Sequence, residues 1–263
     1  MKTSKIILSC LCVLCALCGR IFWFATPGLS GEKGESVPST RVRKGDPDAF
    51  KLLLEGKLRY EREVEDYRVT FYRQECLAPE RNSRMEKPET ILMKFREKPF
   101  SADMRWVDGE KKGSRALYVQ GTNKNRVRVH PSGIAGIFVW MIDLDPNSKQ
   151  IVGKHSRKPI TMAGIGYLMK SLLDQFHSAI ANRDLKVNYI GIESVGGRPA
   201  YKFQRLLPPD KGYYCYELLL WIDKEWAFPV QVETKGWDGV IWEKYRYENF
   251  EFNNGFTDKD FKW

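Results

Sequence analysis

The last fifty residues of the chain carry its most constraining pattern. Apolar and polar side chains alternate through three successive stretches, 214–222, 229–234 and 240–252. This alternation is typical of antiparallel strands that bury one face and expose the other. Asp238 and Gly239 precede the third stretch, and an Asp-Gly pair provides the positive φ angle of a tight hairpin. The region therefore predicts a three-stranded meander whose apolar face packs against the rest of the chain.

Seven further stretches upstream of the meander have the composition and alternation of strands. Glycine, proline or asparagine residues separate them, as is typical of an antiparallel sheet. They lie at 67–72, 90–95, 102–107, 116–119, 125–129, 186–193 and 199–205. Strands at this regular spacing predict one antiparallel sheet with strong curvature.

Two segments have helical periodicity instead. The first begins at Asp46-Pro47-Asp48, which favours a helix start, and carries apolar residues at Phe50, Leu53, Leu54 and Leu58. The second follows Pro159 and carries an apolar stripe made of Ile165, Leu168, Leu172, Leu173, Phe176 and Ile180. Such a stripe predicts a helix that covers one face of the sheet. The predicted fold class is therefore mainly β with covering helices (α+β).

Gly164 and Gly166 stand at the start of the second helix. Two glycines without the third of the G-x-G-x-x-G pattern do not make a dinucleotide-binding fingerprint. We interpret them as positions where the helix approaches the sheet closely.

The first 25 residues have the pattern of a targeting segment. Lys2 and Lys5 precede an apolar run at 6–17, which is the arrangement of a secretory signal. Read through Arg20, residues 6–25 also reach the length of about 20 residues that spans a bilayer. A cleaved signal peptide and an N-terminal membrane anchor stay open as alternatives. Both place the rest of the protein outside the cytoplasm, in the periplasm or cell envelope.

Residues 26–45 are rich in Gly, Ser, Pro and charge, and they predict a flexible linker before a single domain at 46–263. The chain has 43 Lys and Arg against 33 Asp and Glu, a net charge of +10. A basic surface can attract anionic partners such as an anionic membrane surface, but the charge is spread along the chain rather than blocked, which favours a merely soluble basic surface. Lys124, Arg126 and Arg128 make one strand basic, but this is ordinary chemistry for a solvent-facing strand. We predict no nucleic-acid partner.

The cysteines fall into two groups. Four of the six lie at 10–18 in the apolar N-terminal segment, and no second Cys or His cluster at ligand spacing follows them. Small residues do not precede Cys15 and Cys18, which disfavours lipidation there. The other two are Cys76 and Cys215, for which a disulfide in an oxidising compartment and two separately buried thiols are both open.

Few residues of the chain fit catalytic or metal-binding patterns. The histidines, His130, His155 and His177, are not at the spacing of zinc ligands. No G-x-S-x-G nucleophile motif is present. The stretch 143–147 matches the first half of a calcium loop, but Ser148 stands where that loop needs Gly, which favours a simple turn. The sequence therefore predicts no metal, no cofactor and no catalytic residue.

A curved sheet with a covering helix can enclose a ligand cavity between the two layers, because ligand pockets are concave and mostly apolar. Bulky apolar residues are the candidates for its lining. They are Trp106, Trp140, Leu168, Leu172, Phe176, Trp221 and Trp242. For any single Trp, filling the core is the simpler interpretation.

Several motifs resemble those of known exported proteins. The stretches 197–203, 220–223, 228–233 and 256–261 look like the C-terminal half of LolA/LolB-like lipoprotein carriers. Three others resemble a bacterial exported family, domain-of-unknown-function family 1571. These are Phe95-Arg96-Glu97-Lys98-Pro99-Phe100, Leu117-Tyr118-Val119-Gln120-Gly121 and the stretch from Ser156 to Gly166. The resemblance covers roughly residues 46–263.

This resemblance implies a half-barrel of antiparallel strands whose concave side accepts acyl chains or a hydrophobic peptide. It transfers no catalytic residue. Our first hypothesis is a non-enzymatic envelope protein that binds a lipid, a lipoprotein acyl chain or another hydrophobic ligand. The alternative is an envelope sensor or protein-interaction domain of the same fold, whose core is filled by its own side chains.

Overall fold

The computed structural model describes residues 45–78, 84–133 and 140–263, which belong to one compact unit, Thr40–Trp263. The signal or anchor predicted for residues 1–25 lies outside the described residues, and so does the linker predicted for 26–45, apart from Gly45. Within the described part of the chain, no helix is long and apolar enough to span a bilayer.

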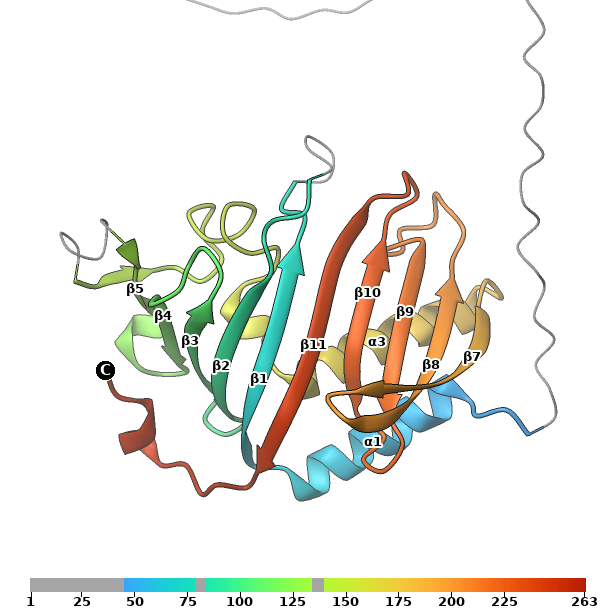
Figure 1. The fold of residues 1–263 in the computed structure, drawn as a ribbon, viewed down its shortest axis with the longest axis horizontal. Helices are drawn as coiled ribbons and strands as arrows, with labels where there is room; N and C mark the ends of the chain where they lie inside the picture. Colours follow the sequence, from blue (N-terminus) through green and yellow to red (C-terminus); the bar gives the residue numbers. More distant parts are fainter. Residues whose placement is uncertain (1–44, 79–83, 134–139) are drawn as a thin grey trace, which may run out of the picture. The chain divides into compact units, whose positions relative to one another are not determined.

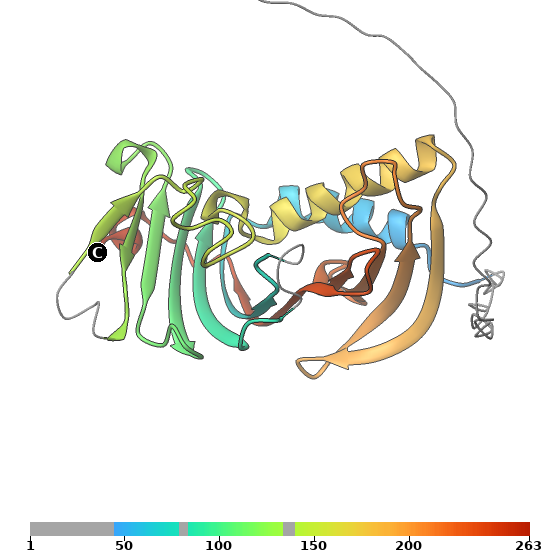
Figure 2. The same ribbon diagram turned by 90° about the horizontal axis from the view of Figure 1, so that it is seen from above.

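One antiparallel sheet holds the eleven strands of the described residues, in the order β6-β5-β4-β3-β2-β1-β11-β10-β9-β8-β7. The strands of its first half are β1 (Asp66–Glu75), β2 (Glu89–Arg96), β3 (Ser101–Asp108), β4 (Arg115–Val119), β5 (Val127–His130) and β6 (Ile142–Leu144). Those of its second half are β7 (Lys186–Val195), β8 (Arg198–Leu206), β9 (Glu217–Asp223), β10 (Pro229–Lys235) and β11 (Ile241–Phe252). The sheet is strongly curved and open (Figure 2). This confirms the predicted fold class, although the short β6 was not predicted.

The C-terminal meander lies at the centre of this sheet, beside the first strand of the domain (Figure 1). β1 pairs with β11 from Tyr67, opposite Phe252, to Glu75, opposite Glu243. Every other pair of neighbouring strands is consecutive in the chain, so this pair alone joins the two halves of the described sheet. Side chains from both ends of the domain therefore share one concave surface.

Two α-helices of the described chain lie on the concave side, along the second half of the sheet (Figure 2). They are α1 (Ala49–Glu63) and α3 (Ile165–Ala181). The two helices pack on each other, α1 also reaches β9, and α3 reaches β10. The carboxylate of Asp48 caps α1 by accepting hydrogen bonds from the backbone N–H groups of Phe50 and Lys51. Three short 3-10 helices are η1 (Asn123–Asn125), η2 (Ile160–Met162) and η3 (Asp258–Phe261).

The buried face of α1 differs from the predicted one. Leu54 and Leu58 are exposed, whereas Gly56 and Tyr60 are buried together with Leu53. The helix turns Gly56 toward the segment between β9 and β10, where a Cβ on that glycine would lie 2.1 Å from a backbone carbonyl oxygen. Of the four predicted apolar positions, Leu53 is buried and Phe50 packs against the core, so the prediction holds for these two and not for Leu54 and Leu58.

The buried face of α3 follows the predicted stripe more closely. Its buried residues are Ile165, Met169, Leu172, Leu173, Phe176 and Ala179, whereas Ile180 is exposed. A Cβ on Gly164 would lie 2.7 Å from the ring of Phe95, and one on Gly166 would lie 2.8 Å from the ring of Tyr60. Gly164 therefore allows the close approach of the helix to the sheet that the sequence predicted, whereas Gly166 allows α3 to approach α1.

Candidate ligand cavity

A cavity of about 630 Å³ lies on the concave face, beside the N-terminal end of α3. Its floor comes from β1 to β6 and from β11. Residues 150–164, here called the roof segment, form the facing wall. Figure 2 shows this segment on the concave side, next to the start of α3. Ligand pockets typically measure about 300–1,000 Å³, so the cavity has the size of a binding site.

Most of the cavity wall is apolar. The floor contributes Phe71, Met93, Met104, Trp106, Ala116, Val127, Val129, Ile142 and Leu144, and the roof segment contributes Ile151, Pro159, Ile160, Met162 and Ala163. Met93 and Met104 face each other across β2 and β3. Because methionine side chains are unbranched and adaptable, this part of the wall can adjust to a flexible apolar ligand.

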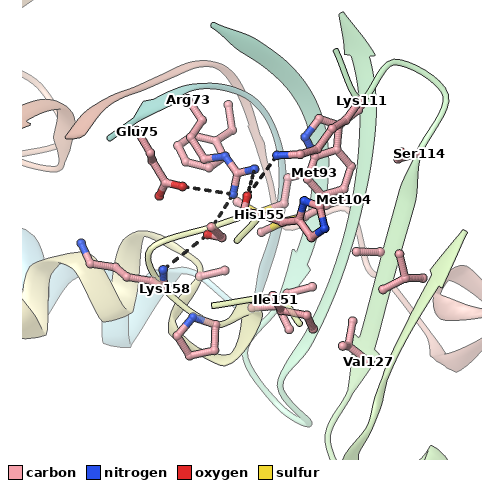
Figure 3. Close-up of a pocket in the computed structure, with 18 of the residues that line it drawn as sticks. Arg73, Glu75, Met93, Met104, Lys111, Ser114, Val127, Ile151, His155 and Lys158 are labelled. Carbon is pink, nitrogen blue, oxygen red and sulfur yellow. Dashed lines mark hydrogen bonds and ion pairs between the residues drawn. The ribbon is translucent and has the colours of Figure 1, made fainter. Parts of the chain in front are cut away.

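Charged side chains gather at one end of the cavity (Figure 3). Arg73 and Glu75 come from the end of β1, Lys111 from the turn after β3, and His155 and Lys158 from the roof segment. The opposite part of the wall in the same view contains Val127 and Ile151. The cavity is therefore amphipathic, with a charged end and an apolar body.

The charged end was not predicted from the sequence, although a signal for it exists. Arg73 and Glu75 have the same parity along β1 as the buried Phe71, so they continue its concave row. Glu89 on β2 and Glu243 on β11 likewise lie in phase with buried neighbours on their strands. Charged residues in phase with an apolar row indicate a buried polar site, and we did not use this signal in predicting the site from the sequence.

Glu89 is the centre of the first ion cluster. Arg73 donates to one of its carboxylate oxygens at 3.0 Å from Nε and 2.6 Å from Nη2, and Lys111 Nζ lies 2.7 Å from the other oxygen. The indole N–H of Trp106 also donates to Glu89, at 3.1 Å. Burial favours a higher pKa for Glu89, but Arg73 and Lys111 outweigh it and hold the pKa below its ordinary value. Glu89 is therefore a carboxylate at neutral pH.

A second ion cluster surrounds Glu243, whose side chain is 1% exposed. Lys158 Nζ lies 2.9 Å from its carboxylate, and the hydroxyl of Tyr214 donates to it at 2.6 Å. The hydroxyl of Tyr245 donates to Glu75 and lies 3.2 Å from the Glu243 carboxylate. Burial favours a higher pKa for Glu243, but Lys158 and Tyr214 outweigh it and lower the pKa.

These clusters fix the roof segment to the sheet. Arg73 Nη1 donates to Ser156 Oγ at 3.0 Å, and the backbone N–H of Arg157 donates to Glu75 at 3.1 Å. Lys158 adds its contact to Glu243. Three successive roof residues thus bind three buried charges of the sheet, and this arrangement keeps the roof segment above the apolar floor.

Trp106 alone among the seven predicted cavity residues lines this cavity. Leu172 and Phe176 are buried in the core beneath α3, and Leu168 packs against that core. The prediction placed the cavity under the covering helix, but α3 packs directly on the sheet and leaves the space beside it. Trp140 is 69% exposed at the edge of the sheet, so it does not line the cavity either.

The two remaining tryptophans also lie elsewhere. Trp221 packs with Val195, Ala200 and Val230, on the face of β9 opposite to the helices. Its indole N–H donates to Glu193 at 2.8 Å. Trp242 lies at the start of β11 and contacts Tyr214 edge to face, at 5.8 Å between ring centroids. Neither is among the residues that line the cavity.

Cys76 and Cys215 are both buried, and they do not form the disulfide that was one of the two predicted alternatives. Cys76 directly follows β1, and its backbone N–H donates to the carbonyl of Trp242. Cys215 lies before β9 and contacts Arg205 Nη2 at 3.3 Å. Among the described residues, no group of three or more His, Cys, Asp or Glu side chains could hold a metal ion.

The chain belongs to a family described as "Protein of unknown function (DUF1571)", whose sequence model matches residues 64–263. The resemblance to family 1571 is thereby confirmed. No curated protein matches the sequence.

Several solved structures are similar to this chain at low sequence identity. MucB has 15% identity and a TM-score of 0.47, over 83% of this chain and 64% of MucB. The Mycobacterium tuberculosis lipoprotein LppX has 14% identity and a TM-score of 0.42, over 75% and 93%. A LolA superfamily protein from Nitrosomonas europaea has 11% identity and a TM-score of 0.32, over 83% and 99%. This chain thus spans less than two thirds of MucB, and none of these likenesses assigns a function to it.

Proposed function

We propose that this protein is a non-enzymatic binding protein of the cell envelope, and that it holds a lipid, an acyl chain of a lipoprotein or another hydrophobic ligand in the cavity. The cavity itself carries this proposal. It is open between the floor and the roof segment, it has the volume of a ligand site, and most of its wall is apolar. Burial of apolar ligand surface there contributes about 25 cal/mol per Å².

The ion clusters support a binding role rather than a catalytic one. The carboxylates of Glu89 and Glu243 are each held by two or more donors, and their lowered pKa values keep them ionised. A general acid at neutral pH needs a raised pKa, and neither carboxylate has one. In this protein the clusters position the roof segment, and the apolar wall provides the affinity.

The signal or anchor predicted for residues 1–25 supports export of the domain, and the net charge of +10 supports contact with an anionic membrane surface. The alternative hypothesis, a sensor domain with a filled core, has less support. The second half of the sheet does have its concave face filled, by α1 and α3, but the first half keeps the cavity.

The test compares two valine substitutions on neighbouring parts of the sheet. Val129 on β5 lines the cavity, whereas Val107 on β3 is 39% exposed and does not. Val129→Phe fills part of the cavity, and Val107→Phe adds the same ring at a solvent-exposed position. We expect the purified full chain to take up a fluorescent fatty-acyl probe and to release lipid on organic extraction. Val129→Phe should reduce both, and Val107→Phe should retain both.

Mass spectrometry of the extract identifies the natural ligand, and thermal unfolding shows that each variant is folded. A wild-type protein that carries no apolar adduct and takes up no acyl probe would rule out the proposal. Equal loss of uptake in both valine variants would show that the effect is not specific to the cavity.

A further inference from the structure

The charges at the polar end of the cavity indicate what kind of headgroup a ligand would have, and this inference rests on the proposed function. Four cationic side chains line the cavity, Arg73, Lys111, Lys154 and Lys158, against the single carboxylate of Glu75. Glu89 and Glu243 lie directly behind this wall. Even with both included, the positive charges at this end outnumber the negative ones.

Three of the four cations already have acidic partners. Arg73 lies 2.6 Å from Glu89, Lys111 lies 2.7 Å from the same residue, and Lys158 lies 2.9 Å from Glu243. Lys154 differs, because no carboxylate of the described residues lies within 4.0 Å of its ammonium group. Its charge is therefore the one at this end that has no internal partner in the described structure.

Lys154 also stands at a place where a ligand can reach it. Lys154 and His155 both line the cavity and are exposed, so the cavity opens to solvent beside them. Lys111 Nζ donates to the backbone carbonyl of His155 at 3.0 Å, which places a second cation at the same opening. Desolvation, together with the charges of Lys111 and Lys154, lowers the pKa of His155. The imidazole thus experiences a positive potential from both lysines.

We propose that the ligand is an amphiphile with an anionic headgroup, a carboxylate or a phosphate, which binds between Lys154 and Lys111 at the opening while its chain lies on the apolar floor. An anion there supplies the partner that Lys154 lacks. A neutral headgroup leaves this charge unpaired, and a cationic headgroup is repelled by both lysines. The roof segment then contacts both parts of the ligand: Lys154 binds the headgroup and Ile151 packs against the chain.

The test uses three amphiphiles with the same twelve-carbon chain, so that only the headgroup varies. Dodecanoate, dodecyl phosphate and 1-dodecanol are titrated against the full chain loaded with a fluorescent acyl probe, at pH 8 and low salt. We expect one or both anions to bind about tenfold more tightly than the alcohol, as measured by displacement of the probe. A factor of about ten is the gain in affinity that one charged hydrogen bond provides. The preference should decrease at high salt because the site is open to solvent. The two anion arms distinguish a fatty acid from a phosphorylated lipid.

Two substitutions in one loop locate the headgroup. Lys154→Gln should weaken the anions about tenfold and leave 1-dodecanol unchanged. Lys149→Gln is the matched control, because Lys149 is exposed nearby and does not line the cavity. Lys149→Gln lowers the net charge of the protein by the same amount as Lys154→Gln. Its effect therefore measures the long-range attraction between the protein and an anionic amphiphile.

The outcomes separate this assignment from the proposed function. Equal affinity for all three amphiphiles, or equal effects of Lys154→Gln and Lys149→Gln, overturns the headgroup assignment while the apolar cavity keeps its role. If the protein takes up neither the acyl probe nor any of the three amphiphiles, the proposed function and the headgroup assignment are both wrong.

Discussion

At the scale of single residues, two buried arginines on the concave face differ in their surroundings. Arg73 lies 2.6 Å from Glu89 and 3.9 Å from Glu75. Arg205 is 1% exposed, and it donates to the side-chain oxygen of Gln175 at 3.0 Å. Its Nε and Nη1 have no hydrogen-bond partner among the described residues. A guanidinium remains charged in proteins, so the desolvation of Arg205 is less well compensated than that of Arg73.

We therefore expect methionine to have opposite effects at the two positions. Arg205→Met replaces a poorly compensated charge by an apolar side chain that fits the core, and it should raise the free energy of unfolding by about 1 kcal/mol or more. Arg73→Met removes the guanidinium that donates twice to one oxygen of the buried Glu89 carboxylate and once to Ser156, and it should lower the free energy of unfolding by about 3–5 kcal/mol. Urea denaturation followed by tryptophan fluorescence measures both changes.

Arg205→Lys serves as the control, because it keeps the charge and should not stabilise the fold. If Arg205→Met destabilised the protein as strongly as Arg73→Met, the buried guanidinium would have a compensating group, and our interpretation of its surroundings would be wrong.

At the scale of elements, the position of α1 depends on a glycine. Alanine is favoured over glycine inside a helix by about 1 kcal/mol. At Gly56 this preference is opposed by contact, because a Cβ would lie 2.1 Å from the carbonyl oxygen of Ala227. The obstacle is backbone, so it cannot move aside as a flexible side chain would. The helix and the turn before β10 must separate to accommodate a methyl group.

Gly56→Ala should therefore lower the free energy of unfolding by about 1–3 kcal/mol, as overpacking does in cores. Glu55→Ala is the comparison, since Glu55 is the exposed neighbour on the same helix and its substitution should change stability by less than about 0.5 kcal/mol. Thermal and urea unfolding measure both variants. A stabilising Gly56→Ala would mean that helix propensity prevails and that α1 is not held closely against Ala227.

The strands were predictable because their alternation is a local property of the sequence. The meander at 229–234 and 240–252 corresponds to β10 and β11 almost residue for residue. The orientation of side chains within an apolar run was not predictable in the same way. Leu220, Trp221 and Ile222 are consecutive, apolar and buried. Without alternation between apolar and polar residues, the sequence does not indicate which of the three faces the helices. Pairing with neighbouring strands turns Trp221 to the face opposite the helices, so it does not line this cavity.

The site was less predictable than the fold, because it depends on contacts between distant segments. Arg73 meets Ser156 across 83 positions of the chain, and Tyr245 meets Glu75 across 170. Strand pairing places Glu75 opposite Glu243, two carboxylates that no local pattern relates. The resemblance to a family indicated that the concave side binds a ligand. It did not indicate which half of the sheet holds the cavity, because that depends on the position at which α3 begins and covers the sheet.

At the scale of the whole molecule, the buried ion clusters make stability depend on pH. Burial opposes ionisation of Glu89 and Glu243, yet their cationic partners lower both pKa values below 4.5. A carboxylate with a lower pKa in the folded state contributes stability that is complete above the unfolded pKa and is lost as the pH falls through the folded pKa. His155 also has a lowered pKa, chiefly because of desolvation and secondly because of Lys111. As the pH falls, His155 is protonated in the unfolded chain before it is protonated in the folded protein. The free energy of unfolding therefore begins to decrease below about pH 6.5.

We expect the free energy of unfolding to decrease in two steps as the pH falls. The first begins near pH 6.5 and comes from His155, and the second begins near pH 4.5 and comes from the two buried carboxylates. Each proton taken up more readily by the unfolded chain contributes a slope of at most about 1.4 kcal/mol per pH unit. Urea denaturation at intervals between pH 8 and pH 3 measures the profile.

Two variants assign the steps to their groups. His155→Gln keeps a polar side chain at the exposed end of the cavity and should remove the first step only. Glu243→Gln should lower stability at neutral pH, because Lys158 loses its ionised partner, and should make the second step shallower. A profile without a decrease above pH 4.5 in the wild-type protein would contradict the role of His155. Since His155 lies between Lys111 and Lys154, a bound anion should raise its pKa, and the first step should then become smaller in the loaded protein.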